Sequence, residues 1–418
     1  MDVPSKPSKF DKCKQGLKVV ATVLGAIIII GAVAFLISIW IGGHIQEPYL
    51  EVEPAPTPDP APTPLSIPDY ITIMGVQIDT SVTELDLSEL ELTSEDLEPL
   101  RYLTYLEHLM LHDNQITDLS PLSELVNLEW LFLERNQVAD LTPISELTNL
   151  TRLALSSNDI SDLTPLSELI NLTHLWLNEN QITDFSPLST LTNMRQLNLS
   201  QTQISDLTPI SELTNLTLLY LSFNRVNDLT PLRNHVNLVQ LWLNSNLIDD
   251  LTELSDLVNL TNISLGENQI ADLAPLASLT NLTSIGLSSN QISDLTPLTY
   301  LTNLTHLWLN DNQITDLSAL SGMSELDLLN LDNNEISDLT PLSELRNLTR
   351  IRLRGNEISD LTPLSEILSL TEVWASNNRI SDLRPLSGLT NLEMLLLANN
   401  PITDWSPVAD VGYVAGRP

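Results

Sequence analysis

The chain is poor in cysteine, aromatic residues, glycine and basic residues, and each shortage excludes a class of protein. Cys13 is the single cysteine, so the rest of the chain holds neither a disulfide framework nor a cysteine-based metal site. Aromatic residues make up 5% of 418 residues and glycine occurs 13 times, which does not suit ordinary enzyme domains. Only 18 Lys and Arg stand against 54 Asp and Glu, and the net charge of −36 repels phosphate backbones. We therefore expect no nucleic-acid partner.

Catalytic and metal-binding patterns are also missing from the sequence. The six histidines are scattered and show no metal-ligand spacing, and no Ser/His/Asp arrangement stands outside the repeat pattern described below. The sequence therefore predicts a protein that is not an enzyme, with no metal site and no cofactor.

The few basic residues are distributed unevenly. All five lysines lie before residue 19, and residues 19–41 follow as 23 residues without a charge. At a rise of about 1.5 Å per residue this run is long enough to cross a hydrocarbon core of roughly 30 Å. We predict a transmembrane helix at 19–41, with the basic tail 1–18 in the cytoplasm and the remainder outside a cell membrane as a single-pass protein. A cleaved signal peptide is the alternative.

A proline-rich segment follows the apolar run. Proline occupies positions 54, 56, 58, 60, 62 and 64. Such alternation favours an extended polyproline conformation, so we expect residues 42–68 to form an extended linker. A proline-motif ligand for another domain is the weaker alternative.

The rest of the chain is a repeat with a period of 22 residues. Thr202 alone interrupts a series of asparagines that recur in register. The asparagines stand at positions 114, 136, 158, 180, 224, 246, 268, 290, 312, 334, 356, 378 and 400. The unit reads L-x-x-L-x-L-x-x-N-x-[IV]-x-D-L-x-P-[LIV]-x-x-L, a leucine-rich pattern. Its L-x-L core alternates as a short strand does, and stacked units build a parallel sheet.

The repeat predicts an α/β solenoid of about 14–15 coils, curved as a horseshoe with a concave parallel β-sheet and a convex side of 3-10 turns. We expect an N-terminal cap and an atypical first coil at 69–106, regular repeats at 107–404, and a C-terminal cap and tail at 405–418, because open solenoid ends expose core leucines. Ser94 is expected to open a helical turn in the first cap, and Trp405 to cover the last coil.

Two polar columns have structural roles. The asparagines are expected to satisfy backbone groups at the turn after each strand, which makes Thr202 a weak position in the stack. Aspartates recur at the same spacing from Asp118 to Asp404 and are expected to cap the next turn. A calcium ladder is disfavoured because one carboxylate per coil does not supply six to eight oxygen ligands.

The unit NLTxLxLxxNQISDLTPLSxL resembles the bacterial internalin-type leucine-rich repeat over about residues 83 to 410. The resemblance implies a curved surface domain that binds a host or neighbouring protein on its concave sheet. The sequence departs from wall-anchored internalins because it has no C-terminal L-P-x-T-G signal with a hydrophobic tail, so attachment by the N-terminus is expected instead.

Candidate binding residues lie at the outward strand positions, which are six, four and two residues before each asparagine. Tryptophan recurs there every third coil, at 66-residue spacing. The candidate partner-binding residues are Trp130, Phe132, His174, Trp176, Tyr220, Trp242, His306, Trp308, Arg350, Arg352, Arg354 and Trp374. Copying of a three-coil block is the alternative explanation of the tryptophans, because NLTHLWLN occurs at 171–178 and again at 303–310.

The same positions hold few acids, so the concave face is expected to be neutral to basic on an acidic body. Arg350, Arg352 and Arg354 form a row that either pairs with Asp332 and Glu372 of the adjacent coils or anchors an acidic group of a partner. The sequence thus predicts a membrane-anchored extracellular module that binds a protein through its concave sheet. A glycan-binding module that uses the Trp column and a non-binding structural spacer are the alternatives.

Overall fold

The computed structural model describes residues 67–417. The basic tail expected at 1–18, the membrane span expected at 19–41 and nearly all of the linker expected at 42–68 lie outside these residues. In the part of the chain that is described, no helix is both long enough and apolar enough to cross a membrane.

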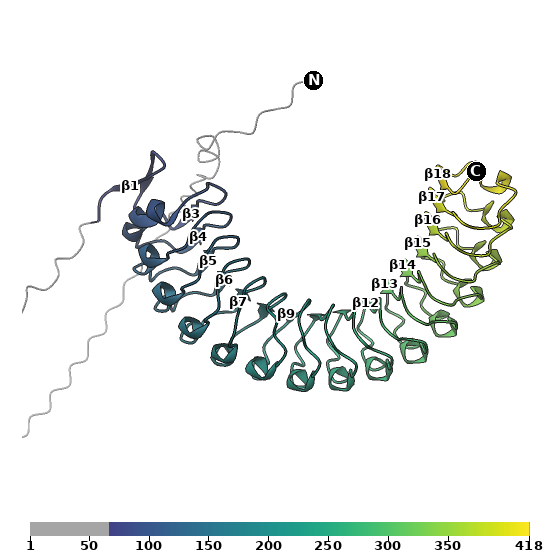
Figure 1. The fold of residues 1–418 in the computed structure, drawn as a ribbon, viewed down its shortest axis with the longest axis horizontal. Helices are drawn as coiled ribbons and strands as arrows, with labels where there is room; N and C mark the ends of the chain where they lie inside the picture. The colour runs from purple at the N-terminus through teal and green to yellow at the C-terminus, as the bar shows by residue number, and fades with distance from the viewer. Residues whose placement is uncertain (1–66, 418) are drawn as a thin grey trace, which may run out of the picture.

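The described chain forms an arc of stacked coils (Figure 1). Short strands line the inner side of the arc, and 3-10 turns follow one another along the outer side. The strands form one sheet of 16 strands in sequence order, from β3 to β18, and every neighbouring pair is parallel, as β7 and β8 are. The predicted leucine-rich solenoid with a parallel sheet and 3-10 turns is therefore confirmed.

The strands are nearly all three residues long. Their bounds are β1 Tyr70–Ile73, β2 Val76–Asp79, β3 Glu84–Asp86, β4 His108–Met110, β5 Trp130–Phe132, β6 Arg152–Ala154, β7 His174–Trp176, β8 Gln196–Asn198, β9 Leu218–Tyr220, β10 Gln240–Trp242, β11 Asn262–Ser264, β12 Ser284–Gly286, β13 His306–Trp308, β14 Leu328–Asn330, β15 Arg350–Arg352, β16 Glu372–Trp374, β17 Met394–Leu396 and β18 Tyr413–Ala415.

The helical segments are all 3-10 turns. Their bounds are η1 Ser94–Tyr102, η2 Ser120–Leu122, η3 Thr142–Ile144, η4 Thr164–Leu166, η5 Ser186–Thr190, η6 Thr208–Ile210, η7 Thr230–Leu232, η8 Thr252–Leu254, η9 Ala274–Leu276, η10 Thr296–Leu298, η11 Ser318–Leu320, η12 Thr340–Leu342, η13 Thr362–Leu364, η14 Arg384–Leu386 and η15 Ser406–Val408.

Leucine columns fill the space between the sheet and the outer turns. In the coil of β7, Leu172, Leu175 and Leu177 are all 0% exposed, and the pattern recurs in the coils on both sides. Burying a leucine side chain contributes about 1.5–3 kcal/mol, so columns that run the length of the arc hold each coil on its neighbours.

The asparagine column joins adjacent coils. Asn180 is representative: its Oδ1 accepts the amide of Ile160 at 3.0 Å. Its Nδ2 donates to the carbonyls of Leu155 at 2.9 Å and Leu177 at 3.0 Å. Both polar ends of a buried side chain are therefore satisfied, which removes the cost of placing it in an apolar stack.

Thr202 occupies the position of the asparagine in its coil and makes fewer hydrogen bonds than Asn180 does. Its hydroxyl donates to the carbonyl of Leu199 at 2.7 Å. Its short side chain does not reach the preceding coil, and within residues 67–417 the amide of Ile182 has no hydrogen-bond partner. The oxygen of Asn224 accepts the amide of Thr202 itself at 3.0 Å. Thr202 therefore lacks the hydrogen bonds to the preceding coil that Asn180 makes.

The aspartate column caps the outer turns. Asp162 is representative: its Oδ1 accepts the amide of Thr164 at 2.8 Å, where η4 begins. Hydrogen bonds from the hydroxyl and the amide of Thr164 lower the pKa of Asp162. In the described part of the chain, no group of three or more His, Cys, Asp or Glu side chains could hold a metal ion.

Both ends of the stack carry elements of their own. At the N-terminal end, β1 and β2 pair as an antiparallel hairpin, and η1 lies beside the first regular turn. At the C-terminal end, Trp405 is partly buried against the core, and the residues that follow pair with β17 as β18. The residues beside the regular coils contribute one further strand at each end of the sheet, β3 and β18.

Candidate functional site

The candidate binding residues lie on the inner, concave side of the arc. In β7, His174 and Trp176 are half-buried and flank Leu175, which is fully buried in the core. The indoles of Trp242, Trp308 and Trp374 are half-buried in the same way. None of these indoles enters the leucine core, because the single central residue of each three-residue strand faces inward.

Strands β4 to β7 bring the first group of aromatic side chains together. The rings of His108 and Trp130 stack with centroids 4.0 Å apart, and Trp130 lies 6.4 Å from Phe132. Phe132 meets Trp176 edge to face at 6.4 Å. The guanidinium of Arg152 lies over the Trp130 ring at 4.4 Å. We call this set, with His174, the β4–β7 aromatic cluster.

His174 belongs to this cluster through its own strand. Its ring lies 5.8 Å from that of Trp176, and its Nδ1 is 2.8 Å from the hydroxyl of Thr173. Burial lowers the pKa of His174, and the nearby guanidinium groups of Arg152 and Arg195 lower it further. The imidazole therefore stays uncharged at neutral pH and contributes an aromatic surface rather than a cation.

The tryptophan column does not form one continuous strip. Tyr220 stacks on Trp242 at 5.8 Å with nearly parallel rings, and His306 stacks on Trp308 at 5.8 Å. Between these two pairs, β11 and β12 place Ser264 and Gly286 in the tryptophan column. The face is thus divided into separate aromatic groups by coils with small residues.

The arginine row is arranged differently from the predicted ion pairs. Arg352 lies over the ring of Trp374 at 4.0 Å, and Arg350 approaches Asp327 of the preceding coil at 3.9 Å. Within residues 67–417, neither Asp332 nor Glu372 forms a salt bridge with the row, so the first of the two alternatives, pairing between adjacent coils, is not found. The guanidinium of Arg352 is instead held by a cation–π contact with the indole.

Asp332 and Arg354 meet through the backbone instead. Oδ1 of Asp332 accepts the amide of Arg354 at 2.7 Å. Burial raises the pKa of Asp332, against this hydrogen bond and the charges of Arg352 and Arg354. The Arg354 side chain is exposed and half of Arg350 is accessible, so this end of the face presents positive charge.

Two features of the concave face were not foreseen from the sequence. Glu84 and Asp86 of β3 align with His108 and Met110, which makes the N-terminal edge of the face acidic. Between Trp242 and Trp308 lies a pocket with a volume of about 360 Å³. The sequence feature that could have predicted this pocket is the pair of small residues, Ser264 and Gly286, between Trp242 and Trp308 in the same column.

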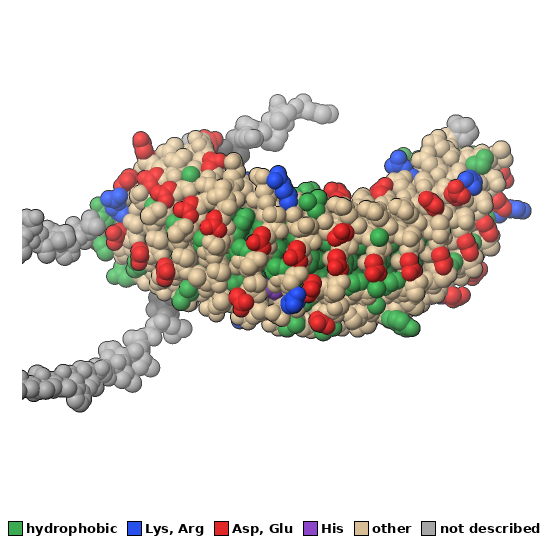
Figure 2. Space-filling view, turned by 60° about the horizontal axis from the view of Figure 1, so that its bottom comes forward, with side chains coloured by type: hydrophobic (Ala, Val, Ile, Leu, Met, Phe, Trp, Pro, Cys, Tyr) green, Lys and Arg blue, Asp and Glu red, His purple; other side chains and the backbone are tan. Residues whose placement is uncertain are grey.

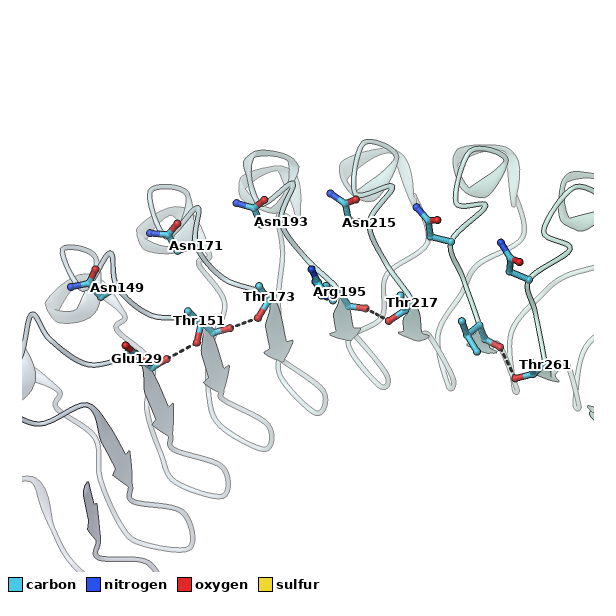
Figure 3. Close-up of a pocket in the computed structure, with 13 residues that line it drawn as sticks. Glu129, Asn149, Thr151, Asn171, Thr173, Asn193, Arg195, Asn215, Thr217 and Thr261 are labelled. Atoms are coloured by element: carbon cyan, nitrogen blue, oxygen red, sulfur yellow. Dashed lines mark hydrogen bonds between the residues drawn. The ribbon is translucent and has the colours of Figure 1, made fainter. Parts of the chain in front are cut away.

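A second hollow runs along the flank of the arc, beside the starts of the strands (Figure 3). It is lined by a second asparagine column and by threonines, among them Asn149, Asn171, Thr151 and Thr173. Nδ2 of Asn149 donates to the carbonyl of Val126 at 2.9 Å, and Asn171 repeats this bond in the next coil. These asparagines therefore link coils, and their Asn-Leu-Thr triplets reflect the repeat.

The outer surface differs in charge from the concave face. Figure 2 shows acidic side chains spread over the outer side of the arc, with few basic ones among them. The concave positions carry Arg152, Arg350, Arg352 and Arg354 against Glu134, Asp332 and Glu372 in the regular coils. The inner face of the regular coils thus carries four arginines and three acidic residues, whereas β3 adds two more acidic residues at its N-terminal edge.

Comparisons with known proteins agree with this architecture. The family model for leucine-rich repeats in two copies matches residues 126–168, 170–212, 214–256, 258–300, 302–344 and 368–410. No curated protein matches the chain.

Three solved structures illustrate the similarity. An internalin from Listeria monocytogenes is 34% identical, with 79% of this chain and 91% of that chain covered and a TM-score of 0.65. A leucine-rich-repeat protein from Leptospira interrogans is 26% identical over 78% of this chain and 92% of its own, with a TM-score of 0.72.

The functional domain of InlJ from Listeria monocytogenes, which includes a cysteine ladder, is 25% identical over 80% of this chain and 72% of its own, with a TM-score of 0.70. The repeats here contain no cysteine, and asparagine forms the buried column instead. From its repeats and from these matches, the chain belongs to the leucine-rich-repeat family and is structurally similar to bacterial internalins.

Proposed function

We propose that the chain is a recognition module that binds a protein ligand on its concave sheet. Leucine-rich-repeat proteins are typically binding modules rather than enzymes, and the similarity to internalins supports a role at a surface. The observation that carries the proposal is the β4–β7 aromatic cluster, whose half-buried rings lie together on a face that the leucine core cannot cover.

Such a cluster suits the centre of an interface. Tryptophan, tyrosine and arginine are enriched in binding hot spots, and the aromatic side chains among them bury a large area at little cost in conformational entropy. Here Trp130 is already held between the ring of His108 and the guanidinium of Arg152, so little further ordering is needed on binding. The arginines at the other end of the face provide donors suited to carboxylates of the same ligand.

We further propose that residues 19–41 anchor the chain in a membrane and place the repeats outside the cell. The support is the uncharged run flanked by lysines. The prediction is tested by extracting membranes with alkaline carbonate and by adding protease to intact cells. An anchored, outward-facing chain stays in the membrane pellet and loses its repeats to the protease.

Site-specific crosslinking tests the concave face. A photoreactive amino acid in place of Phe132 is expected to capture a defined protein on cells that carry the ligand. The same group in place of Tyr300, which is 75% exposed and lies just after η10, is the matched control. Capture from both positions, or from neither, contradicts the proposal.

The purified complex then allows a quantitative test. The Trp130→Ala, Trp176→Ala double variant is expected to lose about 2 kcal/mol or more of binding free energy, roughly 30-fold in Kd. Tyr300→Ala should bind as the unaltered chain does. Equal affinity of both variants would show that the cluster takes no part in binding.

A further inference from the structure

The pocket between β10 and β13 differs from the rest of the concave face. Trp242 and Trp308 stand at its ends, three strands apart, which is about 14 Å at the usual strand spacing. The two strands between them carry Ser264 and Gly286 in the same column, so no large side chain fills the gap. Its volume of about 360 Å³ lies within the range of about 300–1,000 Å³ that is typical of small-molecule sites.

Aromatic rings form the walls of this pocket. Tyr220 covers one face of Trp242 from the preceding strand, and the pocket lies on the side of β11 and β12. Phe223 also lines the pocket, from the turn after β9. Flat apolar surfaces therefore bound the space from both ends.

Phe223 is an aromatic residue at a turn position that is polar in the neighbouring coils. Its backbone is left-handed with φ of 60°, and its side chain is 56% exposed. The same turn position is polar in the neighbouring coils, as Gln201, Ser245 and Glu267, with φ of 56°, 55° and 56°. Because more than half of its surface is exposed, the ring of Phe223 is free to contact something outside the chain.

Unpaired polar groups lie beside these rings. Oδ1 of Asn244 accepts the hydroxyl of Ser264 and the amide of Gly266, and Oδ1 of Asn262 accepts the hydroxyl of Thr261 at 2.8 Å. Within the described chain, the Nδ2 groups of both asparagines and the hydroxyl of Ser284 are left without a partner. The described residues that line the pocket include no lysine or arginine.

We propose that this pocket binds a neutral oligosaccharide made of pyranose rings. The C–H face of a pyranose stacks on the indoles and on Phe223, while its hydroxyl groups accept hydrogen bonds from Asn244 and Asn262. The carboxylate of Glu267 also lines the pocket; its Oε2 already accepts the hydroxyl of Ser245 at 2.7 Å, and its other oxygen accepts hydroxyl groups of the sugar. Because the pocket offers donors and an acceptor without a cation, it matches an uncharged ligand that carries many hydroxyl groups.

An apolar side chain of a protein ligand fits less well. Such a side chain fills the space between the rings. It also covers the carboxamides of Asn244 and Asn262 and the hydroxyl of Ser284 without giving them hydrogen-bond partners. Leaving buried polar groups without partners opposes binding. A sugar satisfies both kinds of surface, because its faces are apolar and its rim is polar.

The sugar site goes beyond the proposed protein-binding function and is tested separately from it. The full-length chain, in a detergent without a sugar headgroup, is titrated with cellohexaose, maltohexaose and chitohexaose. Binding is followed by tryptophan fluorescence and by calorimetry. We expect saturable binding of at least one hexasaccharide at submillimolar to millimolar concentration.

Two variants locate the binding. Gly286→Leu fills the pocket, and the Cβ that it adds meets the hydroxyl of Ser264 at 2.8 Å, an atom that can move. Trp308→Ala removes one wall without adding bulk, so the test does not depend on the folding of the first variant. Each is expected to weaken binding at least ten-fold. Asn198→Leu, which adds the same side chain to the same column outside the pocket, should not.

Two results overturn the proposal. One is the absence of saturable binding for all three hexasaccharides up to 10 mM, a limit of about 3 kcal/mol in binding free energy. The other is binding of N-acetyl-tryptophanamide that Gly286→Leu abolishes, with no hexasaccharide bound, which assigns the pocket to a side chain of a protein ligand. Neither result changes the test of the β4–β7 aromatic cluster, which uses other residues and another ligand.

Discussion

His235 provides a sharp test of how the solenoid is stabilised. It occupies a core position that is leucine in the coils on either side, Leu213 and Leu257, and it is 0% exposed. Its Nε2 lies 3.2 Å from the carbonyl of Ile210, whereas its Nδ1 is buried without a partner among the described residues. We predict that His235→Leu stabilises this part of the stack.

The magnitude follows from the groups that change. Removing a buried nitrogen without a partner gains about 1–3 kcal/mol, and losing the bond from Nε2 costs about 0.5–1.5 kcal/mol. The carbonyl of Ile210 keeps a partner, because it also accepts the amide of Leu213 at 3.0 Å. The net stabilisation is therefore on the order of 1 kcal/mol, measured as slower hydrogen exchange at the amides that close this coil, such as that of Leu238.

The same residue predicts a pH dependence. Burial lowers the pKa of His235, opposed by the carbonyls of Ile210 and Leu232 and by Glu212. Because the folded chain binds the proton less readily than the unfolded chain, stability is retained above about pH 6.5 and is lost as pH falls below it. One proton contributes at most about 1.4 kcal/mol per pH unit.

We therefore expect the exchange rates of the two chains to diverge between pH 7.5 and 5.5, after correction for intrinsic exchange. Leu213→His is the reciprocal control, and it should transfer the pH dependence to the preceding coil. Equal protection in His235→Leu and the unaltered chain at both pH values would refute the reasoning.

Three further changes test other parts of the fold. Thr202→Asn should stabilise the chain by about 1–2 kcal/mol in urea unfolding, because the new carboxamide reaches the amide of Ile182, whereas Asn180→Thr should do the opposite. Arg135→Gln should raise the pKa of Asp113 from about 2 towards its ordinary value in an NMR titration, since the hydrogen bond from Arg135 is the main cause of the lowering. The stabilisation of the folded chain by this pair is present above about pH 3.8 and is lost as pH falls towards 2. Gly355→Ala should lower the melting temperature, because φ of Gly355 is +70° and the added Cβ meets the side chain of Asn333. Gly322→Ala is the control and should leave the melting temperature unchanged, because the space around Gly322 is open.

The fold could be predicted from the sequence because one short pattern determines each coil. The alternation in L-x-L fixes which side chains face the core, and the asparagine and aspartate columns have local tasks that their chemistry specifies. Asn180 and Asp162 make the bonds that the pattern predicts. The ends of the stack were harder to predict, because the residues of β18 do not follow the repeat pattern. Tyr413 of β18 pairs with Met394 of β17, and the two are 19 positions apart rather than 22.

The arrangement of the site could be predicted only in part. The repeat places a residue in a column, but the direction of a long side chain depends on its neighbours in the adjacent coils. Arg350 and Glu372 share a register position, yet Arg350 approaches Asp327 on the other side. His235 likewise looked like one of several scattered histidines, and only its position in the stack shows that it is buried.

The tryptophans show how copied repeats acquire different environments. Trp176 and Trp308 lie in identical NLTHLWLN segments, and each is 5.8 Å from the histidine of its own strand, which agrees with copying of a block. The preceding strand, however, places Ala154 beside Trp176 and Gly286 beside Trp308.

Ala154 is buried, and Trp176 reaches Phe132 two strands away to join an aromatic cluster. Beside Trp308 the glycine leaves space, and the same side chain becomes the wall of a pocket. Copying therefore explains why the tryptophans recur, but the residue in register on the next strand decides what each one can bind. A ligand that contacts only the repeated residue should tolerate exchange of the two coils, whereas the ligands proposed here should not.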